Sequence, residues 1–246
     1  MTTARPFLFL SVRPEHDAVQ PEYAAMLSAT GLGPARLLHH RLDLEPLPPL
    51  PLTRFAGAIV GGSPYNVSQD AARKSPTQLR VEADLARLAV WGIAEDFPLL
   101  FTCYGIGVLT QRLGGSVDTR FGEEAGPVTV SLTDAGRADP LLGSLHPEFT
   151  ALVGHKESTS ELPEAAVLLA TSDECPVQVY RVGSNVYATQ FHPEVLPEDF
   201  IARAYVYQHH GYFPADELAQ VAMRLAASVV TEPRRLMARF VEHYGG

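Results

Sequence analysis

The sequence contains only two cysteines, Cys103 and Cys175, among its 246 residues. Two cysteines cannot build the multi-bridge framework of a small secreted protein, and no CxxC pair is present to indicate a zinc site. We expect both thiols to be free, as is usual in a reducing compartment. A free thiol can act as a nucleophile, so the position of each cysteine in the fold becomes informative.

Basic residues and long apolar runs are scarce as well. The chain has 19 Lys and Arg against 28 Asp and Glu, a formal net charge of -9, and no basic stripe of the kind that contacts nucleic acid. Near the N-terminus, residues 7–12 form an apolar run before Arg13 that is too short for a signal peptide or a membrane span. We therefore expect a cytoplasmic protein with neither a nucleic-acid nor a membrane partner.

The sequence does contain the pattern of an α/β protein. With 46% hydrophobic residues, the chain can bury a large core. Short apolar runs alternate with amphipathic stretches, as expected for a mostly parallel sheet with helices on both faces. The predicted strands are 7–12, 37–42, 56–60, 98–102, 127–132, 149–153, 167–171, 177–180 and 186–191, and the predicted helices are 22–30, 77–93, 104–113, 197–209, 215–230 and 233–244.

The second half of the chain differs from the first. Several strands after residue 127 are joined by hairpin-like turns, which predicts a smaller mixed or antiparallel portion. Residues 201–246 are predicted to form a C-terminal helical extension whose apolar positions cover the sheet. No repeat or shift in composition marks a boundary, so we expect residues 1–200 and this extension to form one domain.

Cys103 stands where the predicted strand 98–102 meets the predicted helix 104–113. A sharp strand-to-helix turn projects its side chain above the sheet and aims the first N–H groups of the helix at the group that the side chain attacks. A helix N-terminus or a neighbouring imidazolium also favours the thiolate over the thiol. The alternative interpretation is a buried structural cysteine.

A partner for this thiol follows the predicted strand 186–191. His192 comes directly after it, and Glu194 is close enough in the chain to bind one imidazole nitrogen and leave the other to accept the thiol proton. Two backbone N–H groups could stabilise an oxyanion: that of Tyr104, next to the nucleophile, and that of Gly62, in the turn after the third strand. These residues predict a Cys103–His192–Glu194 catalytic site.

With these motifs identified, the chain resembles the class I (triad) glutamine amidotransferases, particularly stand-alone proteins similar to the amidotransferase domain of GMP synthase. The resemblance runs from about residue 56 to residue 194, through IVGGSPYNV, PLLFTCYGIGVLTQRLGG and ATQFHPEV in the family's order. It implies a flavodoxin-like sheet, an amidotransferase-like domain over residues 1–200, a thioester intermediate, and ammonia released from a glutamine side chain.

The chain also departs from the family's usual G-x-C-x-G-H-Q motif. Thr102 precedes the cysteine, and Ile106 and Gly107 stand where the His-Gln pair is common. The family's glutamine lies against the substrate, so Gly107 removes a polar contact. Gly61, Gly107 and His155 are the positions that the resemblance assigns to substrate binding.

Three functions remain open at this point. The first is a glutamine amidotransferase or glutaminase, which acts on a small γ-glutamyl substrate and supplies ammonia to a separate synthase subunit. The second is a γ-glutamyl peptide or amine hydrolase with the same triad, and the third is a catalytically idle regulatory or binding protein. No metal-ligand cluster or phosphate loop is evident, so we expect neither a metal nor another cofactor.

Overall fold

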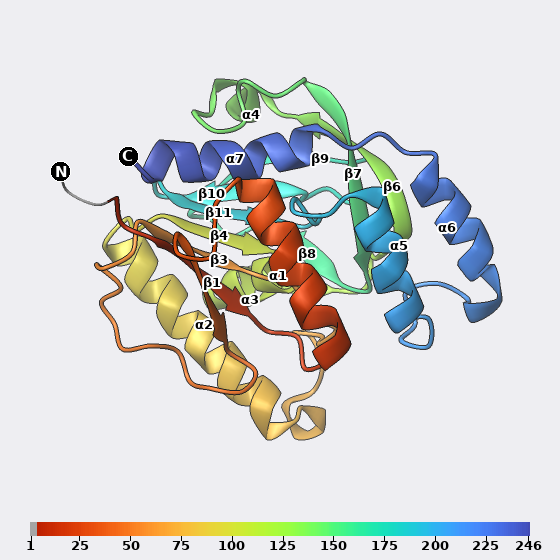
Figure 1. The fold of residues 1–246 in the computed structure, drawn as a ribbon, viewed down its shortest axis with the longest axis horizontal. Helices are drawn as coiled ribbons and strands as arrows, with labels where there is room; N and C mark the ends of the chain where they lie inside the picture. The colour runs from red at the N-terminus through yellow and green to blue at the C-terminus, as the bar shows by residue number, and fades with distance from the viewer. Residues whose placement is uncertain (1–3) are drawn as a thin grey trace.

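A nine-stranded β-sheet crosses the centre of the structure, a computed structural model that describes residues 4–246 (Figure 1). The strand order is β2-β1-β3-β4-β11-β10-β9-β6-β7. The strands are β1 (Phe7–Ser11), β2 (Leu37–Arg41), β3 (Gly57–Val60), β4 (Leu99–Thr102), β6 (Glu123–Leu132), β7 (Glu148–His155), β9 (Ala166–Thr171), β10 (Val179–Val182) and β11 (Val186–Thr189). A separate pair joins β5 (Ser116–Asp118) to β8 (Ser158–Glu161).

The sheet has a parallel half and an antiparallel half. Strands β2, β1, β3, β4 and β11 are paired in parallel, whereas the pairs from β11 through β10, β9 and β6 to β7 are antiparallel. The predicted α/β class is therefore confirmed, and the mixed portion continues the central sheet. Because β4 and β11 are parallel neighbours, Thr102 pairs with Thr189 and the segments that follow them begin side by side.

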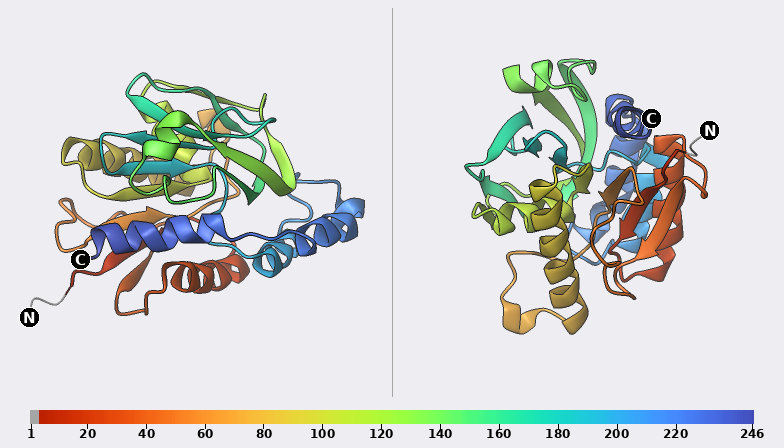
Figure 2. Two further views of the ribbon diagram at one scale, coloured as in Figure 1. Left: turned by 90° about the horizontal axis from the view of Figure 1, so that it is seen from above. Right: turned by 90° about the vertical axis from the view of Figure 1, so that its left-hand side faces the viewer.

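Helices cover both faces of the sheet. Helices α1 (His16–Thr30) and α7 (Glu232–Tyr244) lie side by side on one face, as both views in Figure 2 show, and α2 (Pro76–Ala94) and α3 (Tyr104–Arg112) cover the other. Helices α5 (Pro197–Val206) and α6 (Leu218–Ala226) pack together beside β6 and β7. The shorter helical segments are η1 (Ala71–Arg73), α4 (Asp134–Ala138) and η2 (Ala215–Glu217).

The side chains of β1 explain why the run at residues 7–12 has no polar alternation. Successive side chains of a strand point to opposite faces of the sheet. Phe7 and Phe9 pack with α1 and α7, whereas Leu8 and Leu10 pack with α2 and α3. Both faces of the strand are buried, so Phe7 to Leu10 are all apolar, and the same holds for Leu99 to Phe101 of the central strand β4.

Several element boundaries differ from the sequence prediction. Strands β5 and β8 were not predicted, because SVD and STSE lack an apolar alternation. Helix α1 begins six residues earlier than expected, with Pro21 inside it, and the predicted helix 215–230 divides into η2 and α6. Strand β11 ends at Thr189 instead of residue 191, because the backbone N–H of His192 turns to the carbonyl of Leu152.

The predicted end of the first helix at residue 30 is confirmed. Gly31 follows it, and its φ of 68° lies in the left-handed region that glycine adopts without strain. Within residues 4–246, no helix is both long and apolar enough to cross a membrane.

A buried ion pair ties β1 to α1. The Nε atom of Arg13, just after β1, lies 2.7 Å from Oε1 of Glu22, and both side chains are nearly inaccessible to solvent. Burial alone would lower the pKa of Arg13, but Glu22 and Tyr207 raise it well above its ordinary value. Arg13 therefore remains a cation inside the protein and depends on Glu22 to balance its charge.

Replacing Glu22 should be costly for stability. We expect Glu22→Ala to reduce the free energy of unfolding by about 3 to 5 kcal/mol, because it leaves a buried guanidinium without its counter-ion. Urea denaturation at pH 7 measures the effect. The matched control is Asp134→Ala, which breaks an exposed ion pair with Arg137 and should change the unfolding free energy little. Equal effects of the two substitutions would contradict this account of Arg13.

Candidate active site

Cys103 occupies the turn between β4 and α3. Its φ of 48° and ψ of -99° are unusual for a residue with a side chain, and its backbone N–H donates to the carbonyl of Thr189 at 2.8 Å. Such strained conformations persist only where the surrounding structure holds them, and they cluster at functional sites. The turn leaves Cys103 partly accessible, whereas Cys175 is buried.

His192 and Glu194 lie beside Cys103, beyond the end of the neighbouring strand β11. The Nδ1 atom of His192 is 3.0 Å from Oε1 of Glu194, and both side chains are buried. Cys103 and His192 line the same cavity. The structure thus brings together the three side chains that the sequence nominates as a triad.

The charges of this group depend on one another. Burial would lower the pKa of His192, but Glu194 and Cys103 outweigh it and raise this pKa above its ordinary value. Burial would raise the pKa of Glu194, but His192 and Arg203 together hold it far below its usual range. Glu194 is therefore a carboxylate at neutral pH, and it orients the ring of His192 and stabilises the imidazolium that forms when this ring takes up a proton.

Arg203 is a member of the site that the sequence reasoning missed. This residue of α5 places Nη2 3.1 Å from Oε1 of Glu194 and Nη1 3.1 Å from Nδ1 of His192. Its positive charge lowers the pKa of both partners. No sequence motif marks Arg203. A basic residue within a helix is usually solvated, so nothing in the sequence distinguishes this one.

The two predicted oxyanion donors lie at different parts of the site, Tyr104 next to Cys103 and Gly62 next to His192. Tyr104 begins α3, and Gly62 lies directly against the imidazole, where an added Cβ would stand only 2.6 Å from Cε1 of His192 and 2.9 Å from Nη2 of Arg13. Within residues 4–246, neither backbone N–H is bonded to a protein acceptor. Gly61 faces Phe9 and Glu22 behind this turn instead of the cavity.

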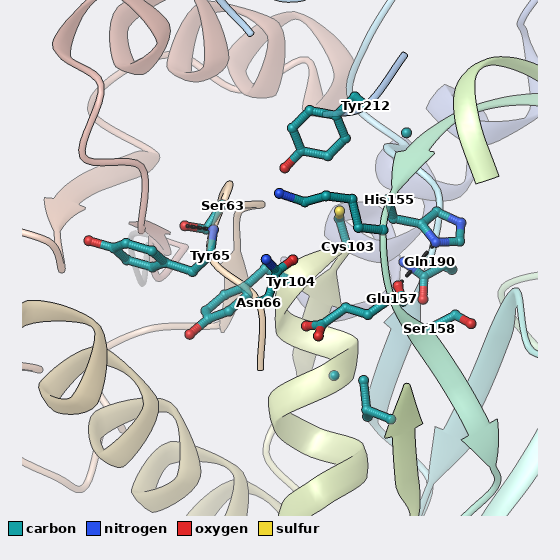
Figure 3. A pocket seen from close by; sticks show the side chains of 14 residues that line it. Ser63, Tyr65, Asn66, Cys103, Tyr104, His155, Glu157, Ser158, Gln190 and Tyr212 are labelled. Atoms are coloured by element: carbon teal, nitrogen blue, oxygen red, sulfur yellow. Dashed lines mark hydrogen bonds between the residues drawn. The ribbon is translucent and has the colours of Figure 1, made fainter. Parts of the chain in front are cut away.

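A second, polar cavity adjoins Cys103 on the α3 side (Figure 3). Gly107 lines it, and an added Cβ there would approach Cγ2 of Val67 to 3.0 Å, so this wall is closed by the loop before α2. Glu157 holds that loop, because its carboxylate accepts the backbone N–H of Val67 and, at 2.9 Å, that of Ser68. The loop therefore forms a fixed wall of the cavity.

His155 also lines this cavity, but its ring points away from Cys103 (Figure 3). Its Nε2 atom is 2.7 Å from Oε2 of Glu123, and its Nδ1 atom is 3.1 Å from the carbonyl of Glu157. Both ring nitrogens are thus bonded within the protein. His155 therefore lines the cavity because β7 ends beside it, and not because its ring nitrogens face the cavity.

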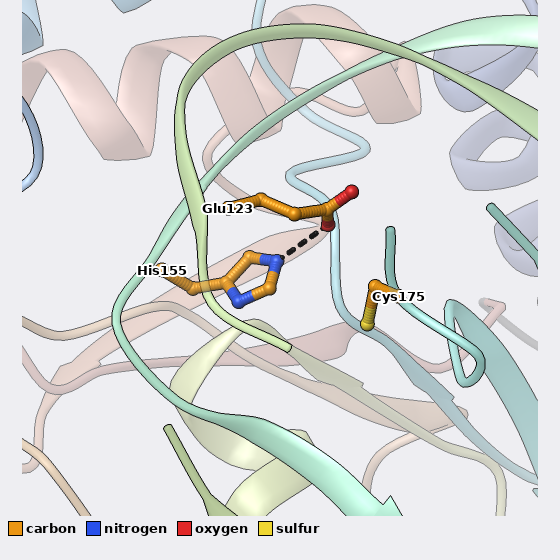
Figure 4. A group of neighbouring side chains, drawn as sticks. All are labelled: Glu123, His155 and Cys175. Carbon is orange, nitrogen blue, oxygen red and sulfur yellow. Dashed lines mark hydrogen bonds and ion pairs between the residues drawn. The ribbon is translucent and has the colours of Figure 1, made fainter. Parts of the chain in front are cut away.

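Glu123, His155 and Cys175 form a buried group whose atoms could in principle hold a metal ion (Figure 4). Glu123 already accepts hydrogen bonds from Gln178 and Ser172 in addition to contacting His155. Burial raises the pKa of Cys175 to about 11, whereas a metal ligand must be a thiolate. These features favour a hydrogen-bonded structural cluster over a metal centre.

Comparison with known proteins gives a consistent result. The family model "Glutamine amidotransferase class-I" matches residues 39–206. A protein from Natronomonas pharaonis that is named as one of the subunits of glutamine-hydrolysing GMP synthase is 35% identical over 101 residues, which are 41% of this chain and 54% of the relative. The matched region therefore spans about half the length of this curated relative.

Solved structures show the same fold at low sequence identity. A glutamine amidotransferase from Methylobacillus flagellatus matches with a TM-score of 0.71 and 16% identity, covering 98% of this chain and 96% of the other. A glutamine amidotransferase from Thermotoga maritima matches with a TM-score of 0.70 and 17% identity, and the match covers 98% of this chain and 100% of the other. Because the family model matches residues 39–206, which are more than half of the chain, the chain belongs to the class I glutamine amidotransferases.

Proposed function

We propose that this chain hydrolyses the γ-carboxamide of glutamine through a thioester on Cys103 and releases ammonia. The observation that carries the proposal is the position of Cys103, at a strained strand-to-helix turn directly beside the His192–Glu194 pair. A nucleophile, a base and a group that orients the base are the parts that acyl transfer through cysteine requires.

The reaction follows from the placement of these groups. The free Nε2 atom of His192 takes the thiol proton while Sγ of Cys103 attacks the carboxamide carbon, and the backbone N–H groups of Gly62 and Tyr104 stabilise the oxyanion. When the C–N bond breaks, His192 returns the proton to the departing nitrogen. Water activated by His192 then attacks the thioester, which yields glutamate and restores the thiol.

The polar cavity supplies contacts for the amino-acid end of the substrate. Lys156 and Glu157 place an ammonium and a carboxylate on the same wall, complementary to the α-carboxylate and α-ammonium of glutamine. Gly107 and His155 form the adjoining wall, and Gly61 allows the turn that carries Gly62 to pack closely against β1. We assign this cavity to the γ-glutamyl part of the substrate.

The C-terminal extension and a synthase partner complete the proposal. We propose that residues 201–246 belong to the same domain as residues 1–200, since Arg203, Tyr207 and Tyr212 complete the walls of the site. We further infer that released ammonia passes to a separate synthase subunit, because the relative from Natronomonas pharaonis bears the name of a GMP synthase subunit.

Replacement of the nucleophile tests the mechanism directly. We expect Cys103→Ser to lower kcat for glutamine by at least about 10³-fold, since the sulfur forms the covalent intermediate. Ammonia release measures the rate, and mass spectrometry of the quenched wild-type enzyme should show the γ-glutamyl thioester. The matched control is Cys175→Ala, which should retain turnover. Wild-type-like turnover by Cys103→Ser would remove the sulfur from the mechanism.

Arg203 should influence the pH dependence through His192. Its charge lowers the pKa of His192, so Arg203→Gln raises that pKa and leaves less neutral imidazole to accept the thiol proton. We expect the acidic limb of the kcat/KM profile to move to higher pH, with a loss of about tenfold or more near neutrality. Arg203→Lys retains the charge, so its acidic limb should lie closer to that of wild type and part of the lost rate should return. An unshifted profile in Arg203→Gln would contradict this role.

Lys156 should act on substrate binding. We expect Lys156→Met to raise KM for L-glutamine about tenfold with little change in kcat, because the ammonium contacts a part of the substrate that does not react. L-Glutaminamide, which lacks the α-carboxylate, serves as the matched substrate. Wild type and variant should have similar KM values for it, and an equal loss with both substrates would argue against a carboxylate contact.

A further inference from the structure

The site has a second lobe, on the His192 side of Cys103, that glutamine hydrolysis leaves unexplained. It adjoins the polar cavity and shares Ser63, Cys103, Gly154 and Tyr212 with it. Its walls are mainly aromatic and aliphatic, and most of them come from α5 and the segment after it: Phe200, Ala204, Tyr207, Tyr212 and Phe213, with Ala125 from β6. We call this space the aromatic lobe.

The position of His192 relates the aromatic lobe to the leaving group. In acyl transfer, the base that takes the proton from the nucleophile returns it to the departing nitrogen. His192 lines the aromatic lobe and does not line the polar cavity, so the leaving nitrogen faces the aromatic lobe when the γ-glutamyl part occupies the polar cavity. The atoms attached to that nitrogen then extend between the aromatic rings.

Size and charge describe what this space can hold. Ammonia has one heavy atom and is well solvated by water, so it gains little from aromatic walls. The two guanidinium groups at the lobe are each paired with a buried carboxylate, Arg13 with Glu22 at 2.7 Å and Arg203 with Glu194 at 3.1 Å. Apart from these paired groups and His192, which shares Glu194 with Arg203, the walls are mainly apolar, and this favours an uncharged hydrophobic group.

We propose that the aromatic lobe is a leaving-group subsite for amines that carry an aromatic or bulky apolar body. The substrates are then γ-glutamyl amides of such amines, which rests on the proposed thioester chemistry. The C–S bond to Cys103 forms, the C–N bond breaks, and the amine leaves with the proton from His192. Water then hydrolyses the thioester to glutamate, so no further reactant is needed.

A substrate series tests the subsite. L-Glutamine, γ-L-glutamyl methylamide and γ-L-glutamyl benzylamide share the γ-glutamyl part and all yield glutamate, whose release gives kcat/KM for each. We expect kcat/KM for the benzylamide to exceed that for the methylamide by at least about tenfold, because a phenyl ring leaves water for an apolar pocket. Equal values for the two amides would overturn the inference.

Substitutions in the aromatic lobe test whether the preference for the benzylamide arises there. Ala204→Leu places extra bulk in the lobe and Phe213→Leu removes a ring, and each should lower the ratio of benzylamide to methylamide kcat/KM at least threefold. The matched control is Tyr205→Ala, since Tyr205 neighbours Ala204 in the chain but is 56% exposed, and its ratio should equal that of wild type. Thermal unfolding shows which variants remain folded, and an unchanged ratio in a folded lobe variant would contradict the subsite.

The series also separates this inference from the proposed function. Turnover of glutamine with no preference for the benzylamide would leave the thioester mechanism in place and overturn the leaving-group subsite alone. No glutamate from any of the three substrates, with no thioester on Cys103, would overturn the proposed function and the subsite together.

Discussion

The parallel pairing of β4 with β11 decides where the reactive groups of this protein lie. Strand β4 delivers Cys103 and β11 leads to His192, and the register pairs Thr102 with Thr189 at their carboxyl ends. The backbone bond from Cys103 to Thr189 continues the pairing one residue beyond β4, into the strained turn. Two residues that are 89 positions apart in the chain therefore meet because their strands are hydrogen-bonded neighbours.

Buried charges surround this junction, and each has a partner. Glu194 lies between His192 and Arg203, and Arg13 is balanced by Glu22. Removing a charge from water is costly, so such groups persist inside a protein only when ion pairs and hydrogen bonds compensate them. Glu22 and Arg203 belong to helices that pack beside the sheet, α1 and α5, so helix packing contributes to the electrostatics of the proposed catalytic group.

The two cavities divide the surroundings of Cys103 by chemistry. The polar cavity is lined by the loop before α2 and by the end of β7, with charged groups at Lys156 and Glu157. The aromatic lobe is lined largely by α5 and the segment that follows it. A substrate that spans both would place its amino-acid end against charged groups and its leaving group against aromatic rings. In the proposed reaction, the C-terminal segment would contribute to substrate selection in addition to covering the sheet.

The sequence by itself determined the α/β class, the position of Cys103 between a strand and a helix, and the family, because each depends on local apolar patterns and short motifs. It did not predict β5 or β8, whose polar residues carry no periodic signal, and it did not nominate Arg13 or Arg203. Arg13 reaches the site from the segment after β1, far from His192 in the chain, and Arg203 reaches it from α5, which packs beside Glu194. Only the tertiary structure brings them together, because packing between distant elements has no counterpart in local sequence patterns.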